Sequence, residues 1–191
     1  MDFMKYNFDY LIYIGRFQPF HLAHMQTIKI ALEQSYKIIL ALGSAQDERN
    51  TKNPFTALER EQMILSNFSE SDQKRIQFVH LIDVYNDVKW IKLVKNQVAA
   101  RVELEDKIGL IGHFKDESSY YLQLFPEWEM LKLESLKGSI SATPLREAYY
   151  RGEIVESAFP LGTSDFLHQF QTTEIFKQLQ HKYQTQDKSN L

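Results

Sequence analysis

The 191-residue sequence contains no cysteine, which excludes a disulfide framework, a zinc site built on thiolates and a cysteine nucleophile. It also contains no apolar run near the roughly 18 residues that a membrane-spanning helix requires. Lysine and arginine together number 22, and aspartate and glutamate 25. The resulting formal net charge of −3 gives the chain no overall attraction to nucleic acid. Local groups must therefore hold any anionic ligand.

Other absences narrow the class of protein further. No Gly-x-Gly-x-x-Gly follows the first apolar run, which argues against a redox dehydrogenase. The first residues, 1–5, lack a basic segment followed by an apolar stretch, so we expect no signal peptide. Hydrophobic residues make up 43% of the chain and charged residues 25%, as is typical of a soluble globular protein. We expect a cytoplasmic protein with neither a nucleic-acid nor a membrane partner.

Short apolar runs alternate with amphipathic stretches along most of the chain. The runs are nearly continuous, as in parallel strands that are covered on both faces, and span residues 10–14, 37–42, 76–81, 107–111 and about 130–133. The stretches between them predict helices over residues 24–33, 57–68, 87–101 and 118–124, the second after a capping box that begins at Thr56. This alternation predicts an α/β fold, a Rossmann-like doubly wound parallel sheet.

The pattern changes after Gly152, where only helices are expected. They span residues 153–158 and about 164–183, and the polar residues 184–191 predict a frayed end. We therefore expect a Rossmann-like domain over residues 1–152 and a C-terminal helical extension of the same domain over 153–191. Ligands of such a sheet bind beyond the carboxyl ends of its strands. Unusual residues follow the first, second and fourth strands, so we expect the site there.

The loop after the first strand combines a tight turn with phosphate-binding groups. Gly15 permits close backbone approach, and Arg16 can make a bidentate cationic contact. His21 and His24 are three residues apart, so at the start of a helix both side chains face one spot. The free N–H groups of a helix N-terminus also suit phosphate. As alternatives, the histidines are ordinary polar residues of a helix start, or zinc ligands that lack a third partner.

A second polar element occurs far downstream, at residues 140–146. Thr143 is a good N-cap and Pro144 a good first helical residue, so a helix should begin there. Ser141 and Thr143, with the exposed N–H groups, can bind phosphate, and Arg146 can point back over it. The alternative is that Arg146 only caps a surface helix.

Together these elements resemble the paired motifs of the nucleotidyltransferase superfamily. Gly-x-Phe-x-Pro-x-His-x-x-His at residues 15–24 is similar to its phosphate-binding motif, with Ala23 where a glycine is usual, and residues 140–146 match Ile-Ser-x-Thr-x-x-Arg. The resemblance implies that ATP is bound by Gly15, Phe17, His21, His24, Gly112, Ser141, Thr143 and Arg146. It also implies that charge on the leaving pyrophosphate is stabilised by His21, His24, Arg16 and Arg146.

Further segments resemble nicotinamide mononucleotide adenylyltransferases of the archaeal type and the N-terminal domain of bacterial enzymes that fuse this activity to a Nudix hydrolase. They are residues 43–46, 52–60, 85–90 and 112–116. The resemblance implies that the mononucleotide is bound by Asn86, Trp90, Lys52 and Ser44, with the indole stacked on the nicotinamide ring. As alternatives, Trp90 belongs to the core, Asn86 starts a helix, Lys52 is solvated and His113 is a loop residue. The pairs Tyr120–Tyr121 and Tyr149–Tyr150 are expected to serve packing.

The implied reaction is attack of the 5′-phosphate of nicotinamide mononucleotide on the α-phosphorus of ATP, which gives NAD and pyrophosphate. The nucleophile is already an anion at neutral pH, so the protein has to position two anions and stabilise charge. Mg²⁺ is expected with the ATP, held mainly by substrate and water, since no carboxylate cluster resembles a metal site. Alternatives are nicotinate mononucleotide, phosphopantetheine or FMN as acceptor, CTP as donor, and a non-catalytic nucleotide sensor.

The fused enzymes carry a second domain whose motif this chain lacks. A Nudix box needs a glycine and a spaced Arg-Glu…Glu-Glu cluster, and the sequence contains none. A Nudix hydrolase domain in a longer parent chain and a homo-oligomer are both left open by the sequence.

Overall fold

The computed structural model describes residues 6–46, 48–113, 117–133 and 140–188. The chain forms two compact units, each assembled from separate segments. The first unit takes residues 1–16, 26–46 and 69–139, and the second takes residues 17–25, 47–68 and 140–191. The expected domain boundary at residue 152 stays a prediction.

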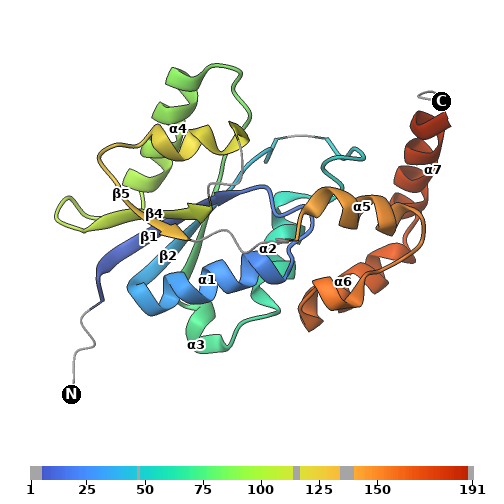
Figure 1. The fold of residues 1–191 in the computed structure, drawn as a ribbon, viewed down its shortest axis with the longest axis horizontal. Helices are drawn as coiled ribbons and strands as arrows, with labels where there is room; N and C mark the ends of the chain where they lie inside the picture. Colours follow the sequence, from blue (N-terminus) through green and yellow to red (C-terminus); the bar gives the residue numbers. More distant parts are fainter. Residues whose placement is uncertain (1–5, 47, 114–116, 134–139, 189–191) are drawn as a thin grey trace. The chain divides into compact units, whose positions relative to one another are not determined.

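A five-stranded parallel sheet forms the first unit, with the strand order β3-β2-β1-β4-β5 (Figure 1). The strands are Phe8–Gly15 (β1), Ser35–Leu42 (β2), Ile76–His80 (β3), Ile108–His113 (β4) and Glu129–Leu133 (β5). The chain winds outward in one direction from β1 through β2 to β3, and in the other through β4 to β5. β1 therefore lies at the switch point of a doubly wound sheet, which confirms the predicted Rossmann-like fold.

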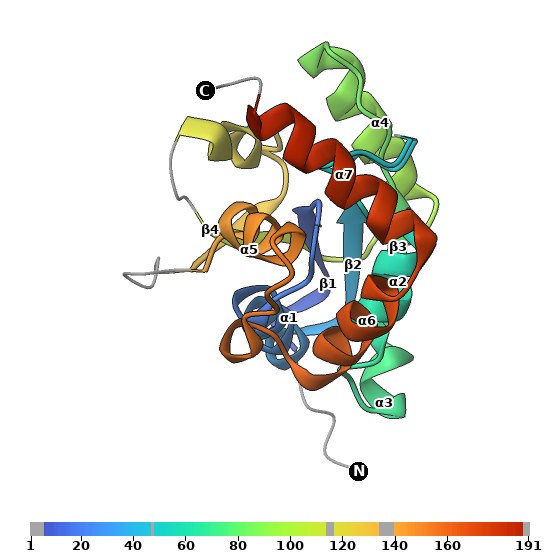
Figure 2. The same ribbon diagram turned by 90° about the vertical axis from the view of Figure 1, so that its right-hand side faces the viewer.

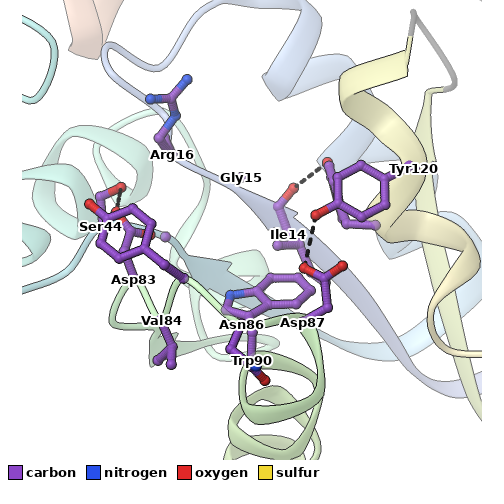
Figure 3. Close-up of a pocket in the computed structure, with 13 residues that line it drawn as sticks. Ile14, Gly15, Arg16, Ser44, Asp83, Val84, Asn86, Asp87, Trp90 and Tyr120 are labelled. Atoms are coloured by element: carbon purple, nitrogen blue, oxygen red, sulfur yellow. Dashed lines mark hydrogen bonds between the residues drawn. The ribbon is translucent and has the colours of Figure 1, made fainter.

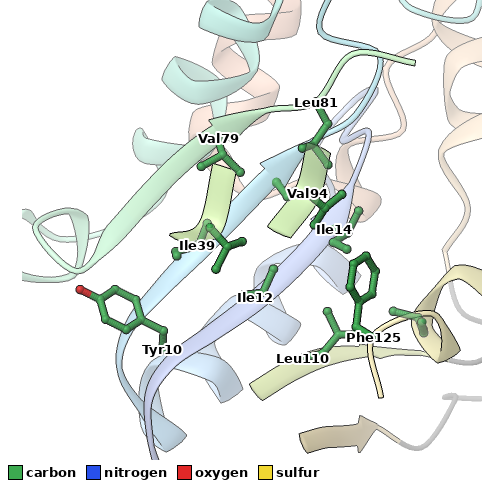
Figure 4. Close-up of a cluster of buried hydrophobic side chains, with 12 residues drawn as sticks. Tyr10, Ile12, Ile14, Ile39, Val79, Leu81, Val94, Leu110 and Phe125 are labelled. Carbon is green, nitrogen blue, oxygen red and sulfur yellow. The ribbon is translucent and has the colours of Figure 1, made fainter. Parts of the chain in front are cut away.

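Helices cover both faces of this sheet, which explains the continuous apolar runs of β1 and β2. On one face, Val94 and Val98 of α4 (Asp87–Ala99) pack against Ile12, Ile14 and Ile39 (Figure 4). On the opposite face lies α1 (Leu22–Gln34), whose residues 26–34 belong to this unit (Figure 1).

Four helices make up most of the second unit: α2 (Ala57–Leu65), α5 (Ala142–Tyr150), α6 (Leu161–Gln171) and α7 (Glu174–Lys188). α6 packs on α2, and α7 packs on both α5 and α6 (Figure 2). Aromatic rings fill the space between them, with Tyr149 and Phe176 at 4.6 Å and Phe55 and Phe170 at 5.1 Å between centroids. The expectation that Tyr149 and Tyr150 serve packing is confirmed by their burial.

Local sequence signals predicted the start of α2 correctly. Thr56 caps α2 through Glu59, and the reciprocal bond of the capping box is also present, as predicted. The segment expected near residues 118–124 is the 3₁₀ helix η1 (Glu117–Gln123), and a short helix α3 (Glu70–Gln73) was not expected. Among the described residues, no helix has the length and apolar character needed to cross a bilayer.

The prediction for the C-terminal part was wrong in three respects. The single helix expected over residues 164–183 is divided into α6 and α7, because the Thr172 and Thr173 hydroxyls donate to the last carbonyls of α6. The Thr173 hydroxyl also accepts from the Phe176 amide and so begins α7. Over residues 153–158 only a 3₁₀ turn, η2 (Glu156–Ala158), forms after Gly152 turns the chain at φ 92°. α7 continues through residues expected to be frayed, as far as Lys188.

Candidate active site

Two histidine rings stack on each other in the second unit. The centroids of His21 and His24 are 3.6 Å apart, as the spacing of three residues predicts. Phe20 stacks on His24 at 5.8 Å, and Phe17 meets the same ring edge-on at 4.8 Å. Phe17 is only 1% exposed and has a φ of 51°, an unfavourable value for a residue with a side chain. Its ring therefore fixes the position of the His24 imidazole.

The hydrogen bonding of His24 determines which of its nitrogens can serve a ligand. Its Nδ1 accepts a hydrogen bond from the backbone N–H of His21 at 3.3 Å. In the neutral ring the proton is consequently on Nε2, which becomes a donor. The pair thus offers N–H donors suited to phosphate oxygens.

Arg146 of α5 is tied to the loop that carries these histidines, although it lies 128 residues beyond Gln18. Its Nη1 donates to the backbone carbonyl of Gln18 at 2.8 Å, and its Nη2 to Thr143 Oγ1 at 3.4 Å. The buried Gln18 side chain in turn donates to the Phe55 carbonyl and accepts from the Phe55 amide. Arg146 is therefore anchored to the loop that carries the histidine pair, which is more than the helix-capping role left open for it.

The N-terminus of α5 differs from its predicted position. The N-cap is Ser141 rather than Thr143, and the helix begins at Ala142, two residues earlier than expected. Pro144 fits because it lies in the first turn, where its missing N–H has no helical acceptor to lose. Ser141 makes no capping bond through its side chain, and Ser141 and Thr143 are both exposed.

Lys52 lies in the same unit, on a loop that the surrounding helices hold in place. The Tyr150 hydroxyl donates to the Thr51 carbonyl at 3.1 Å, and the Thr51 hydroxyl donates to Gln186 of α7 at 3.1 Å. The backbone N–H of Lys52 donates to Asn50 Oδ1, while its side chain is exposed. Its predicted contact with substrate stays a prediction, beside the alternative of a solvated lysine.

A bidentate ion pair supports this loop at the start of α2. Arg49 donates to both carboxylate oxygens of Glu59, at 2.6 and 2.7 Å, and to the Pro54 carbonyl at 2.9 Å. Burial works to raise the pKa of Glu59, but hydrogen bonds from Arg49 and Thr56 and the charge of Arg49 together hold it below its ordinary value. Glu59 therefore remains ionised and keeps both the ion pair and the capping box.

The first unit contains a pocket of about 530 Å³ at the carboxyl ends of its strands (Figure 3). Five of the predicted site residues line it: Gly15, Arg16, Ser44, Asn86 and Trp90. They come from the loops after β1, β2 and β3 and from the first turns of α4. Three further lining residues, Gly43, Tyr85 and Asp87, lie in segments that resemble the adenylyltransferases but were not predicted to be site residues. The others are Ile14, Asp83, Val84, Tyr120 and Tyr121.

Ser44 and Asp83 form a hydrogen-bonded pair on one wall of the pocket. The buried Ser44 hydroxyl donates to Asp83 Oδ2 at 2.6 Å (Figure 3). The φ of Ser44 is 50°, a left-handed conformation that side chains other than glycine rarely adopt, so its bond to Asp83 offsets a local cost. Elsewhere in the pocket, burial raises the pKa of Tyr121 and the charge of Arg16 opposes this effect. The charge of Arg16 therefore influences the pKa of Tyr121, a residue that lines the pocket.

Trp90 and Asn86 each combine a structural role with a place in the pocket. Trp90 packs edge-on against Tyr121 at 6.1 Å and against Phe125 at 5.8 Å, at the margin of the hydrophobic core. Asn86 is the N-cap of α4, and its Oδ1 accepts from the Lys89 amide at 3.0 Å. The alternatives of a core tryptophan and a helix-start asparagine are thus partly confirmed, while both residues line the cavity.

Asp87 and Tyr120 form a second pair on the opposite side of Trp90 in Figure 3. The exposed Tyr120 hydroxyl donates to Asp87 Oδ1 at 3.0 Å. The neighbouring Tyr121 hydroxyl donates to the Ile14 carbonyl at 3.4 Å. The expectation that the two tyrosines serve packing holds only for Tyr121. Both tyrosines line the pocket as well.

Neither aspartate of the pocket was among the residues predicted to bind substrate, although Asp87 lies in the segment 85–90 that resembles the adenylyltransferases. The rule that ligands bind beyond the carboxyl ends of parallel strands applies equally to β3 and would have found Asp83 and Asp87.

The end of β4 does not line the pocket, although Gly112 was expected to bind ATP. Gly112 is buried, and a Cβ there would lie 3.2 Å from Leu122, so packing against η1 already explains the glycine. His113 shares a hydrogen bond with Thr27 of α1 at 3.2 Å. Residues 114–116 of the segment that resembles the fused enzymes lie outside the described residues.

Among the residues that the structure describes, no three His, Cys, Asp or Glu side chains lie close enough together to hold a metal ion. The two aspartates of the pocket each accept a hydroxyl hydrogen bond instead.

The sequence is similar to proteins with named activities. A protein of Acinetobacter baylyi named nicotinamide/nicotinic acid mononucleotide adenylyltransferase is 68% identical over 186 residues, which cover 97% of this chain and 99% of the relative. The nicotinamide-nucleotide adenylyltransferase of Pyrococcus furiosus is 26% identical over 180 residues, covering 93% of this chain and 92% of the relative.

A solved structure from Francisella tularensis matches with a TM-score of 0.85 and 33% identity over 93% of this chain. It is described as a bifunctional NMN adenylyltransferase/ADP ribose pyrophosphatase complexed with AMP and a Mn ion, and this chain spans 53% of its length. The family model described as cytidylyltransferase-like matches residues 12–148, which include both the histidine loop and the element that ends at Arg146. The chain therefore belongs to the cytidylyltransferase-like family.

Proposed function

We propose that this protein transfers the adenylyl group of ATP to nicotinamide mononucleotide, with NAD and pyrophosphate as products. One observation carries the proposal: Arg146, far away in the sequence, donates a hydrogen bond to the backbone of the loop that carries the stacked histidine pair. The Acinetobacter relative, which matches over nearly its whole length, is named for this activity.

The chemistry requires positioning more than activation. The 5′-phosphate of the mononucleotide is an anion at neutral pH and can attack the α-phosphorus of ATP without a protein nucleophile. Charge then develops on the leaving pyrophosphate. N–H donors on His21 and His24 and the guanidinium of Arg146 are suited to stabilise that charge, because the surrounding contacts fix them before the reaction.

The pocket of the first unit supports a nucleotide-sized acceptor. Its volume lies within the range of about 300–1,000 Å³ that is common for small-molecule sites. Trp90 offers an aromatic face for the pyridine ring, Arg16 offers a cation for a phosphate, and Ser44 and Asn86 offer polar groups. The roles of Trp90, Ser44 and Asn86 are those that the resemblance implied, whereas Arg16 was expected to stabilise charge on the leaving pyrophosphate.

The divalent cation enters as part of the nucleotide substrate. The described residues form no metal cluster, so ATP phosphates and water supply its ligands, and Mg²⁺ is the ion we propose. Its chemical contribution is to neutralise charge on the transferred and leaving phosphates. A cytoplasmic location, a homo-oligomer and a Nudix domain in a longer parent chain stay predictions.

Nicotinate mononucleotide is a second acceptor, favoured by the Acinetobacter relative, whose name includes both the nicotinamide and the nicotinic acid compound. The test is pyrophosphate release from ATP and Mg²⁺ with each mononucleotide or with phosphopantetheine, and separate detection of NAD. The proposal predicts fast release with nicotinamide mononucleotide, lost in His24→Ala. His168→Ala, which changes an exposed histidine of α6, serves as the control.

If no acceptor supports release while ATP or NAD still binds, the chain is a nucleotide sensor and the transferase proposal is wrong. If phosphopantetheine is the better acceptor, the fold and chemistry stand but the substrate does not.

A further inference from the structure

Three formal charges line the pocket of the first unit: the guanidinium of Arg16 and the carboxylates of Asp83 and Asp87. A hydroxyl group orients each carboxylate, Ser44 for Asp83 and Tyr120 for Asp87. Phosphate groups of the substrates, rather than a substituent of the pyridine ring, are expected to pair with the guanidinium of Arg16. The charge left to face the pyridine ring is therefore negative.

Asp87 lies close to the place where the ring would stack. It precedes Trp90 by three residues on α4, so the two side chains project from the same face of the helix. Figure 3 shows its carboxylate beside the indole and directed toward Tyr120. The bond to Asp87 is the main cause that raises the pKa of Tyr120, which keeps the phenol protonated and able to donate. The carboxylate is thus held next to the aromatic surface.

Asp87 also changes the electrostatic character of the N-terminus of α4. A helix N-terminus carries a partial positive charge and would favour an anionic substituent on the substrate. The Asn86 side chain already accepts from the Lys89 amide, and Asp87 adds a full negative charge in the first turn. Removing that charge would leave this end of the helix more favourable to an anion.

We propose that the Asp87 carboxylate, positioned by Tyr120, makes this pocket select nicotinamide mononucleotide over nicotinate mononucleotide. The inference rests on the proposed function and names the residues that set its substrate preference. A carboxylate only accepts hydrogen bonds, and the carboxamide NH₂ of the nicotinamide compound can donate one. The acid has no such donor at neutral pH, and its negative charge is repelled.

Asp87→Asn keeps the shape of the side chain and removes its charge. We expect the preference, measured as the ratio of kcat/KM for the two mononucleotides, to fall about tenfold, equivalent to about 1.4 kcal/mol. The change should appear in KM rather than kcat, because the ring substituent is remote from the reacting phosphates. It should also shrink as salt is raised, since Asp87 is exposed.

Tyr120→Phe tests the positioning role. It leaves the Asp87 charge in place but removes the hydroxyl that holds it, so we expect a smaller shift of about threefold in the same direction. In the double variant the shift should not exceed that of Asp87→Asn alone, because both changes act through one group. The matched control is Asp72→Asn in α3, which also removes a first-turn carboxylate that accepts a hydroxyl hydrogen bond, from Ser69 at 2.8 Å.

Calorimetric titration of each variant with each mononucleotide, without ATP, gives the same ratio from Kd values and does not depend on turnover. A ratio for Asp87→Asn that stays within twofold of wild type in both assays overturns the inference, and so does an equal shift in Asp72→Asn. If wild type releases no pyrophosphate, the proposed function fails, yet the Kd ratio still decides the role of Asp87. If wild type binds neither mononucleotide, both proposals are wrong.

Discussion

Replacing Arg146 separates its structural contribution from its catalytic one. In Arg146→Ala the charge-assisted bond to the Gln18 carbonyl, at 2.8 Å, is lost together with the weaker contact to Thr143. Because Arg146 is half-buried, we take the low end of the usual range for such a bond, about 1.5 kcal/mol. For a chain of this length, that loss should lower Tm by about 3–6 °C.

The catalytic effect should be larger. If the guanidinium stabilises the leaving pyrophosphate, removing this one preorganised donor should reduce kcat by about 100- to 1,000-fold. Arg146→Lys keeps the positive charge but cannot donate to Gln18 and a phosphate through one planar group. We expect its kcat to fall about tenfold, between wild type and the alanine variant.

The assay is steady-state pyrophosphate release at saturating ATP, Mg²⁺ and nicotinamide mononucleotide, with Tm measured by calorimetry on the same samples. Arg151→Ala is the control, because Arg151 is an exposed arginine at the C-cap of the same helix. It should change neither quantity. If Arg146→Ala lowers Tm as expected but retains kcat within threefold of wild type, Arg146 only anchors the loop, and the assigned catalytic role is wrong.

Three further predictions concern stability, substrate binding and the metal. Glu59→Gln should lower the free energy of unfolding by about 1 kcal/mol at pH 7 through loss of the Arg49 ion pair. Because the folded-state pKa of Glu59 is depressed, this difference should begin to shrink as pH falls through the ordinary value of 4.5 and be lost below the folded-state pKa; equal differences at pH 7 and pH 3 in urea unfolding would contradict it. Trp90→Ala should raise KM for nicotinamide mononucleotide by about 10- to 100-fold with little change in kcat, as loss of aromatic stacking implies, and an unchanged KM would place Trp90 in the core alone. Removal of divalent ions by chelation should stop pyrophosphate release, and added Mg²⁺ or Mn²⁺ should restore it; release that resists chelation contradicts the metal requirement.

Features that depend on neighbouring residues could be predicted from the sequence. Apolar runs located the strands because a strand covered on both faces has no polar side to show. The capping box at Thr56 is complete within four residues, so its geometry follows from local bonding. The spacing of His21 and His24 predicted that both side chains face one spot, and the structure shows their rings stacked at the start of α1.

Local sequence patterns did not predict helix ends correctly where a residue can adopt more than one conformation. The N-cap of α5 at Ser141 and the break at Thr172 involve hydroxyl residues that can cap, back-bond or remain exposed. Which of these occurs depends on the packing of the helices that follow, and no short stretch of sequence contains that information.

Chemistry could thus be inferred from residue types, whereas the pairings within the site depended on the folded chain. Histidine and arginine in these motifs indicate a phosphate-binding site by their chemical character, and the resemblance of the motifs to the nucleotidyltransferase superfamily implies a transferase. Only the fold brought Arg146 to Gln18, Ser44 to Asp83 and Tyr120 to Asp87, across separations of 128, 39 and 33 residues. Strand order and helix packing set these contacts, because side chains distant in sequence meet only after the sheet has brought its loops to one edge.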